Sequence, residues 1–86
     1  GRVTRQLIRK KIDGKCHFCT ENRYELLDAH RIIEGGTYDL RNTVTSCALC
    51  HRKVHAGFLK IDRRYLRSDG RWVLHWWDEN GVEHYD

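Results

Sequence analysis

The chain has no long hydrophobic run: no stretch approaches the about 20 consecutive apolar residues that a membrane-spanning helix needs. It also lacks internal repeats, low-complexity segments and the pattern of a signal peptide. These absences exclude a membrane-spanning helix and a repeat protein. They predict an intracellular protein in a reducing compartment, the cytoplasm or, in a eukaryote, the nucleus.

Apolar residues are scarce for a chain of this length. The 86 residues are 40% hydrophobic and 33% charged. A domain of this size is near the limit at which burial of apolar surface alone stabilises a fold. We therefore expect a single domain, residues 1–86, that needs an additional cross-link such as a bound metal ion.

Basic residues are absent from the C-terminal end of the chain. Residues 72–86 contain four acidic residues and no lysine or arginine, whereas residues 1–71 contain all 16 basic residues and eight acidic ones. The two parts carry formal charges of −4 and +8, which sum to the net charge of +4. The basic part is typical of a phosphate-binding surface, although a merely hydrated surface has the same composition.

Four cysteines occur in two close pairs, each with two intervening residues. Paired Cys-x2-Cys knuckles bring four thiolates to one tetrahedral site, which is the pattern of a structural zinc ion. Two disulfides are the alternative, but this spacing suits a disulfide within a pair poorly. We therefore predict a structural zinc ion bound by Cys16, Cys19, Cys47 and Cys50.

The two ends of the chain show different periodicities. Residues 3–12, within the basic segment 1–15, predict an amphipathic helix with Leu7, Ile8 and Ile12 on its apolar face. Residues 61–86 alternate and contain Asp-Gly and Asn-Gly turn signals, which predict a three-stranded antiparallel meander. Trp72, Leu74 and Trp76 are expected on one face of it and Val73, His75 and Trp77 on the other, with one face in the core.

The middle of the chain, residues 16–58, holds shorter elements around the knuckles. Residues 24–33 predict a strand or hairpin arm, which the Gly-Gly pair at 35–36 ends before a loop at 37–42. Residues 43–45 predict a short strand, and residues 50–58 predict a helix that ends near Gly57. His51 and His55 lie four residues apart on one face of that helix, so both rings can reach one ion. His30 on the facing strand would complete an open site with three protein ligands.

The segment from Cys16 to His55 thus combines two knuckles with His30, a Gly-Gly pair, Asn42 and Cys-His-x3-His. This combination closely resembles the HNH endonucleases of the ββα-metal superfamily, in the branch whose two Cys-x2-Cys knuckles bind zinc. The resemblance covers about half of the chain. It implies an α+β fold, with a small ββα-metal (HNH) core stapled by the zinc ion, an N-terminal helix and a C-terminal antiparallel β meander.

The resemblance also implies an activity: a metal-dependent endonuclease that hydrolyses DNA phosphodiester bonds and leaves 5′-phosphate and 3′-hydroxyl ends. The partner would be DNA, contacted mainly through its phosphates, with the choice of target left to a further domain of a larger protein. The implied catalytic residues are His30, Asn42 and His51, with Asn42 in an orienting role. The implied ligands of a catalytic Mg²⁺ or another divalent transition metal are His30, His51 and His55, and the implied phosphate contacts are Arg31, Arg41, Arg52 and Lys53.

Arg31 departs from the pattern of the family. Many HNH sequences carry a metal ligand followed by a general-base histidine here, whereas this chain has His30 followed by Arg31, and arginine cannot be deprotonated in practice. In one alternative His30 is the base, and Asp28 or the helix histidines bind the ion. In a second, Arg31 binds the scissile phosphate and another group activates water. In a third, the chain is a non-catalytic zinc-binding module that docks on DNA or on a protein.

Overall fold

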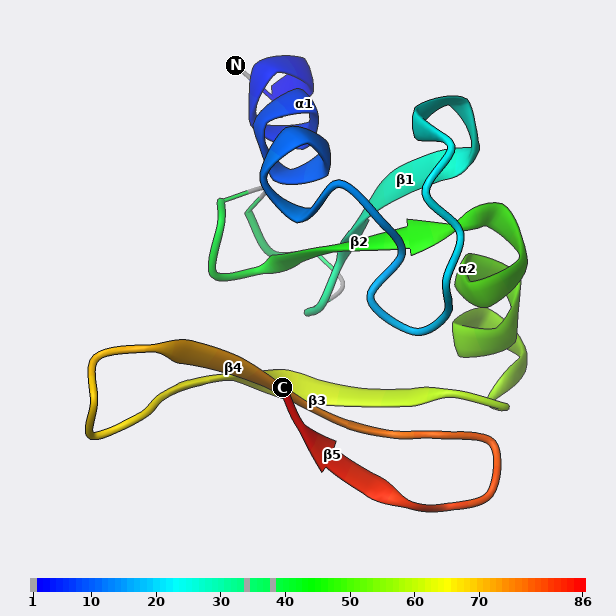
Figure 1. The fold of residues 1–86 in the computed structure, drawn as a ribbon, viewed down its shortest axis with the longest axis vertical. Helices are drawn as coiled ribbons and strands as arrows, with labels where there is room; N and C mark the ends of the chain where they lie inside the picture. Colours follow the sequence, from blue (N-terminus) through cyan, green and yellow to red (C-terminus); the bar gives the residue numbers. More distant parts are fainter. Residues whose placement is uncertain (1, 34, 38) are drawn as a thin grey trace.

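The computed structural model describes residues 2–33, 35–37 and 39–86. These residues form a small mixed α/β fold with two α-helices and two antiparallel sheets (Figure 1). None of the described helices has the length and apolar character needed to cross a membrane. The elements in chain order are α1 (Arg2–Asp13), a 3-10 turn (Tyr24–Leu26), β1 (Leu27–Arg31), β2 (Thr43–Cys47), α2 (Ala48–Ala56), β3 (Lys60–Leu66), β4 (Trp72–Trp77) and β5 (Glu83–Tyr85).

The first sheet pairs β1 with β2 and lies between the two helices. Its antiparallel register runs from Leu27 opposite Cys47 to Arg31 opposite Thr43. Every residue of β2 is buried, because α1 contacts the sheet from one side and α2 from the other. The strand predicted over residues 24–33 is shorter than expected, because a 3-10 turn occupies its first three residues and pairing with β2 ends at Arg31. α2 begins two residues earlier than predicted, and Gly57, in the left-handed conformation with φ 86°, ends it as expected.

The N-terminal helix is confirmed, but its predicted inner face is wrong. Leu7, Ile8 and Ile12 are exposed, whereas Arg9 is buried with 7% of its surface accessible. The guanidinium group of Arg9 donates to Oγ1 of Thr43 at 3.3 Å and pairs with Asp13 at 3.0 Å. Polar partners on β2 therefore replace the apolar contact that the helical periodicity predicted.

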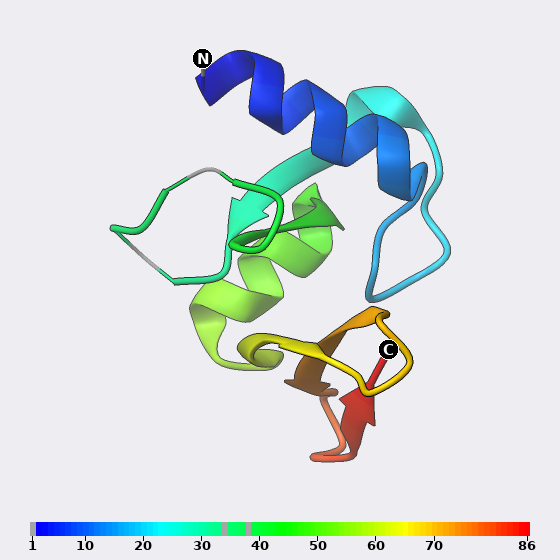
Figure 2. The same ribbon diagram turned by 90° about the vertical axis from the view of Figure 1, so that its left-hand side faces the viewer.

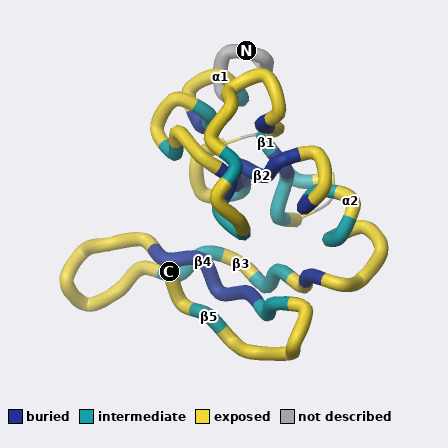
Figure 3. The backbone as a smooth tube through the Cα atoms, turned by 45° about the vertical axis from the view of Figure 1, so that its right-hand side comes forward, coloured by how far each residue is buried: buried dark blue, intermediate teal, exposed yellow. Residues whose placement is uncertain are grey.

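The second sheet is the predicted three-stranded meander, in the order β3-β4-β5. It lies on the opposite side of the β1–β2 sheet from α1, as Figures 1 and 2 both show. Leu74 and Trp76 of β4 are buried in the hydrophobic core, so the expectation that one face joins the core is confirmed. Trp72, predicted to share that face, is 43% exposed at the end of β4. Figure 3 shows the buried residues concentrated on β2 and β4. Together with buried residues of neighbouring segments they form the hydrophobic core, which comprises Cys16, Leu27, Val44, Cys47, Cys50, Leu59, Leu74 and Trp76.

Candidate metal centres

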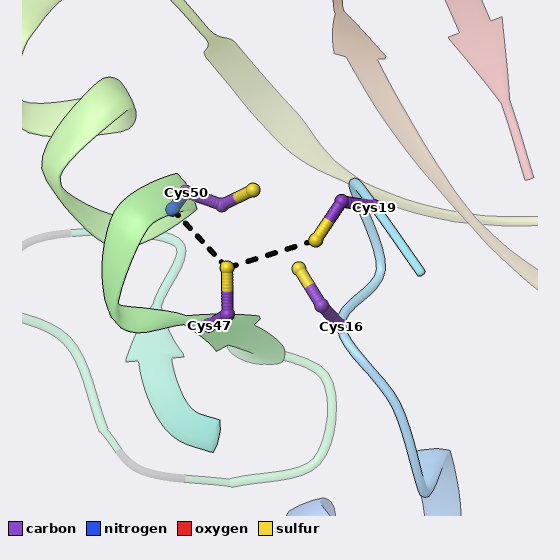
Figure 4. A group of neighbouring side chains, drawn as sticks. All are labelled: Cys16, Cys19, Cys47 and Cys50. Carbon is purple, nitrogen blue, oxygen red and sulfur yellow. Dashed lines mark hydrogen bonds between the residues drawn. The ribbon is translucent and has the colours of Figure 1, made fainter. Parts of the chain in front are cut away.

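The four cysteine side chains converge on one point between the 16–19 loop and the start of α2 (Figure 4). Their sulfur atoms all lie within 4.8 Å of one another, and the Sγ atoms of Cys19 and Cys47 are 3.6 Å apart. A metal–sulfur bond of about 2.3 Å in a tetrahedron places the sulfurs about 3.8 Å apart. The cluster therefore fits a metal ion without rearrangement, and we describe it as a metal-binding cluster. Cys16, Cys47 and Cys50 are buried, whereas Cys19 is exposed.

Backbone hydrogen bonds hold both knuckles in place. Cys47 is the N-cap residue of α2, and its sulfur accepts a hydrogen bond from the backbone N–H of Cys50 at 3.4 Å. In the first knuckle the sulfur of Cys16 accepts from the N–H of Phe18 at 3.4 Å. The N–H of His17 donates to the carbonyl of Thr45 at 2.9 Å, which fixes the loop against β2.

The protonation of the thiols also favours a cation at this point. Burial raises the pKa of Cys50 and that of Cys19. Burial acts in the same direction on Cys47, but hydrogen bonds from the Cys50 N–H and from neighbouring thiols outweigh it and lower the pKa of Cys47. Several thiolates cannot share this small volume unless a positive charge lies between them. Tetrathiolate sites of this geometry suit zinc or iron.

A second group of donors lies on the other side of the β1–β2 unit. His30 of β1 faces His51 and His55 of α2, and the ligating nitrogens of the three rings lie within 4.8 Å of one another. The ring centroids of His30 and His51 are 4.6 Å apart, and those of His51 and His55 are 4.8 Å apart. The three rings line a cavity of about 370 Å³ that also touches Arg31 and Val54. This three-histidine cavity has the i, i+4 geometry that the sequence predicted.

His30 is prepared to act as a neutral ligand. Burial, followed by the charges of His51 and His55, lowers the pKa of His30 to about 4, so its ring nitrogens are free of an added proton at neutral pH. Nδ1 of His51 lies 3.6 Å from Oδ2 of Asp28. A carboxylate at this position can orient the ring, which is the usual role of a residue behind a metal-ligating histidine.

Asn42 lies in the connection between β1 and β2, where its side chain braces the loop. Its Oδ1 accepts from the N–H of Ile33 at 2.9 Å, and its Nδ2 donates to the carbonyl of Thr37 at 2.8 Å. A Cβ atom at Gly36 would come within 2.6 Å of that Nδ2, which explains the small residue there. Through these contacts Asn42 holds the backbone of the loop that follows β1.

The four predicted phosphate contacts do not form one surface. Arg31 lines the three-histidine cavity and donates to the carbonyl of Gly36 at 3.3 Å. Arg52 is exposed and borders a hollow beside His51. Lys53 instead pairs with Glu79, and Arg41 borders a different hollow, with its guanidinium 5.0 Å from the centre of the Trp72 ring.

Two polar clusters were missed by the sequence analysis. In the meander, the ring nitrogens of His75 lie 2.8 Å from Oδ2 of Asp62 and 2.5 Å from Oε1 of Glu83. A register shift between Ile61 and Arg63 sets the position of Asp62, and no local signal announces it. The other cluster is formed by two arginines around Thr43, from elements that are far apart in sequence.

Comparison with known proteins identifies one similar curated protein. Anaredoxin from Nostoc sp. (strain PCC 7120 / SAG 25.82 / UTEX 2576) is 41% identical to this chain over 51 residues. The matched segment is 56% of this chain and 66% of anaredoxin, so the chain spans just under two thirds of that relative. No family model matches the chain, and no solved structure matches it.

This similarity overturns the prediction of a DNA endonuclease, and with it the prediction of an enzyme. The name of the similar protein is that of a redoxin and not that of a hydrolase. The predicted catalytic Mg²⁺ also lacks support, because magnesium prefers oxygen ligands whereas the candidate site offers three imidazole nitrogens. Arg31 also agrees with this correction, because it stands where many HNH endonucleases have the general-base histidine and arginine cannot act as that base.

Proposed function

We propose that this chain is a small electron-transfer module that holds one iron ion in the thiolates of Cys16, Cys19, Cys47 and Cys50. The observation that carries the proposal is the four-cysteine cluster itself, in which three cysteines are buried and Cys19 is exposed. The sequence similarity to anaredoxin, whose name indicates a redox protein, supports iron over zinc, because zinc has no redox chemistry.

The protein's own groups suit that role. An iron ion bound by four thiolates supplies a one-electron couple whose potential depends on hydrogen bonds to the sulfurs and on burial. The N–H groups of Phe18 and Cys50 donate to two of the sulfurs and stabilise their negative charge. Phe18 packs edge-on against Trp76 with ring centroids 4.9 Å apart, which excludes water from the inner side of the cluster. Cys19 provides the short path to a partner.

We also propose that β1, β2 and α2 form a ββα-metal unit whose three histidines bind a second divalent ion. Support comes from the convergence of His30, His51 and His55 and from the Asp28 carboxylate behind them. Imidazole donors suit zinc, copper, iron or nickel. This site would be separate from the tetrathiolate, since its three histidines share no ligand atom with the cysteine cluster.

The test of the electron-transfer proposal is metal analysis combined with spectroscopy. Protein made under iron-replete, anaerobic conditions should contain one iron per chain in the cysteine cluster. It should show thiolate-to-iron charge-transfer absorption and a reversible one-electron couple. The Cys50→Ser variant should lose the absorption, and the His55→Ala variant should keep it. A cluster that takes only zinc when both metals are offered, with no couple by voltammetry, would refute the proposal.

Non-catalytic nucleic-acid binding is a second candidate function. One observation favours it: Arg31 and Arg52 flank the histidine site, within a part of the chain that carries a formal charge of +8. Binding of this kind falls steeply with salt. The Arg52→Gln variant should reduce the slope of log affinity against log salt by about one. An affinity that does not change between low and high salt would exclude this function.

A further inference from the structure

A second large cavity contains no residue of either donor group, although His17 of the first knuckle lines it. It is bordered by the end of α1 and residues 15–17, by the loop before β2, by β3 and β4, and by Asp86 near the C-terminus. Its volume is about 670 Å³. Its lining includes Arg9, Lys15, Arg41, Arg64 and Trp72, and we call it the arginine cavity.

Two guanidinium groups of this cavity bind the same residue, Thr43. Arg9 donates to the side-chain oxygen of Thr43 at 3.3 Å, and Arg64 donates to the carbonyl oxygen of the same residue from Nε at 3.2 Å and from Nη2 at 3.0 Å. Burial, followed by the charge of Arg9, lowers the pKa of Arg64 to about 10. Neighbouring like charges destabilise each other unless an anion compensates them.

The protein itself supplies too little negative charge here. The lining contains four lysine or arginine residues and two carboxylates, those of Asp13 and Asp86. Asp13 pairs with Arg9, and the Asp86 carboxylate accepts from Nε1 of Trp76 at 2.7 Å and lies 2.8 Å from Nε2 of His17. Within the described part of the chain, Lys15, Arg41 and Arg64 form no ion pair with a carboxylate. The lining therefore carries a formal charge of about +2, which the Asp39 carboxylate near Arg41 reduces and a bound anion could neutralise.

Trp72 adds a flat apolar surface beside these charges. Its ring is 43% exposed although it is one of the largest side chains in the protein, and the Arg41 guanidinium lies 5.0 Å from its centre. Arginine forks bind phosphate oxygens in pairs, and exposed aromatic rings stack on planar ligands. From this combination we infer that the arginine cavity binds a small phosphorylated ligand that carries a planar ring, of the nucleoside-monophosphate class.

AMP is the probe for this site, and binding is measured by calorimetry and by the fluorescence of Trp72. We expect saturable binding of AMP, weaker binding of ribose 5-phosphate and no binding of adenosine. Lys15→Gln should weaken AMP binding about tenfold, the value of one charge-assisted contact. Lys11→Gln, an equal charge change on an exposed α1 residue outside the cavity, should change it by less than about twofold.

Arg64→Gln should weaken binding further, and its thermal melt reports whether the meander still packs on β2. Because Lys15 is exposed, its variant tests the site even if the Arg64 variant does not fold. Equal losses in the Lys15 and Lys11 variants would mean diffuse attraction and overturn the inference. So would the absence of AMP binding at about 10 mM.

Discussion

Removal of the tetrathiolate metal should unfold the chain, and the Cys50→Ser variant makes the loss permanent. Cys50 is buried, and its backbone N–H donates to the sulfur of Cys47, which caps the start of α2. The cluster also forms part of the hydrophobic core, next to Leu27, Leu74 and Trp76. Loss of the ion would leave three cysteine side chains in that core without their common partner, and burial raises the pKa of one of them, Cys50.

The magnitudes decide the outcome. A domain of 86 residues has a total stability of about 4–13 kcal/mol, from about 0.05–0.15 kcal/mol per residue. Metal binding by cysteine-containing sites in small zinc peptides contributes about 10–16 kcal/mol. The metal term is therefore as large as the whole stability, so the metal-free chain should not keep its native core.

Two measurements check this prediction. Far-ultraviolet circular dichroism follows the helices, and fluorescence follows Trp76, which packs beside the cluster. A strong chelator under reducing conditions should abolish cooperative melting in the wild-type chain, and Cys50→Ser should reproduce that state without a chelator. His55→Ala, which alters an exposed residue of the other donor group, should still melt cooperatively. A metal-free chain that melts at the same temperature as the metal-bound chain would refute the reasoning.

Three further predictions concern the fold. Hydrogen bonds to the Asp62 and Glu83 carboxylates raise the pKa of His75. The contribution of His75 to the free energy of unfolding is therefore complete below the unfolded-state pKa and is lost as pH rises through the folded-state pKa. The difference in melting temperature between wild type and His75→Gln should be larger at pH 5.5 than at pH 9, and an equal difference would contradict this. Gly36→Ala should cost about 1–3 kcal/mol, because its Cβ would meet Asn42 at 2.6 Å, and Asn42→Ala in the same chain should relieve part of the loss in chemical denaturation. Leu74→Ala, at a fully buried site, should lower the free energy of unfolding in urea by about 2–5 kcal/mol. Leu66→Ala, at an exposed site, should lower it by less than about 0.5 kcal/mol. Similar losses in the two variants would show that the meander does not belong to the core.

Local spacing predicted the parts of this molecule whose geometry is local. Two Cys-x2-Cys turns and two histidines four residues apart each fix the distance between their own side chains, so their donors could be assigned before the structure. The meander was predictable for the same reason, since its turns set which strands pair. The function was not, because the same thiolate spacing suits zinc or iron and therefore describes the coordination but not the reaction.

The features that sequence reasoning missed depend on contacts between distant segments. The periodicity of residues 3–12 favoured an apolar inner face, but β2 presents Thr43 and Thr45 to the helix. The Arg9 guanidinium donates to the Thr43 hydroxyl, which a leucine could not do, and the Thr45 hydroxyl donates to the backbone carbonyl of Arg9. Trp72 was expected in the core because large side chains are usually buried in small domains. It lies instead at the strand end, beside Arg41 from a different part of the chain. Neither arrangement has a signal in the residues next to it.

The two donor groups share one helix, and this sets how each depends on the other. Cys47 caps α2 and Cys50 lies in its first turn, whereas His51 and His55 occupy the following positions on the face toward β1. An ion in the tetrathiolate ties the start of the helix to the 16–19 loop, so it fixes the position of both histidines before they bind anything. The reverse dependence is weak, since His55 is exposed and the three-histidine cavity is open to solvent, outside the hydrophobic core. The tetrathiolate therefore organises the fold, and the three-histidine site depends on a helix already in place.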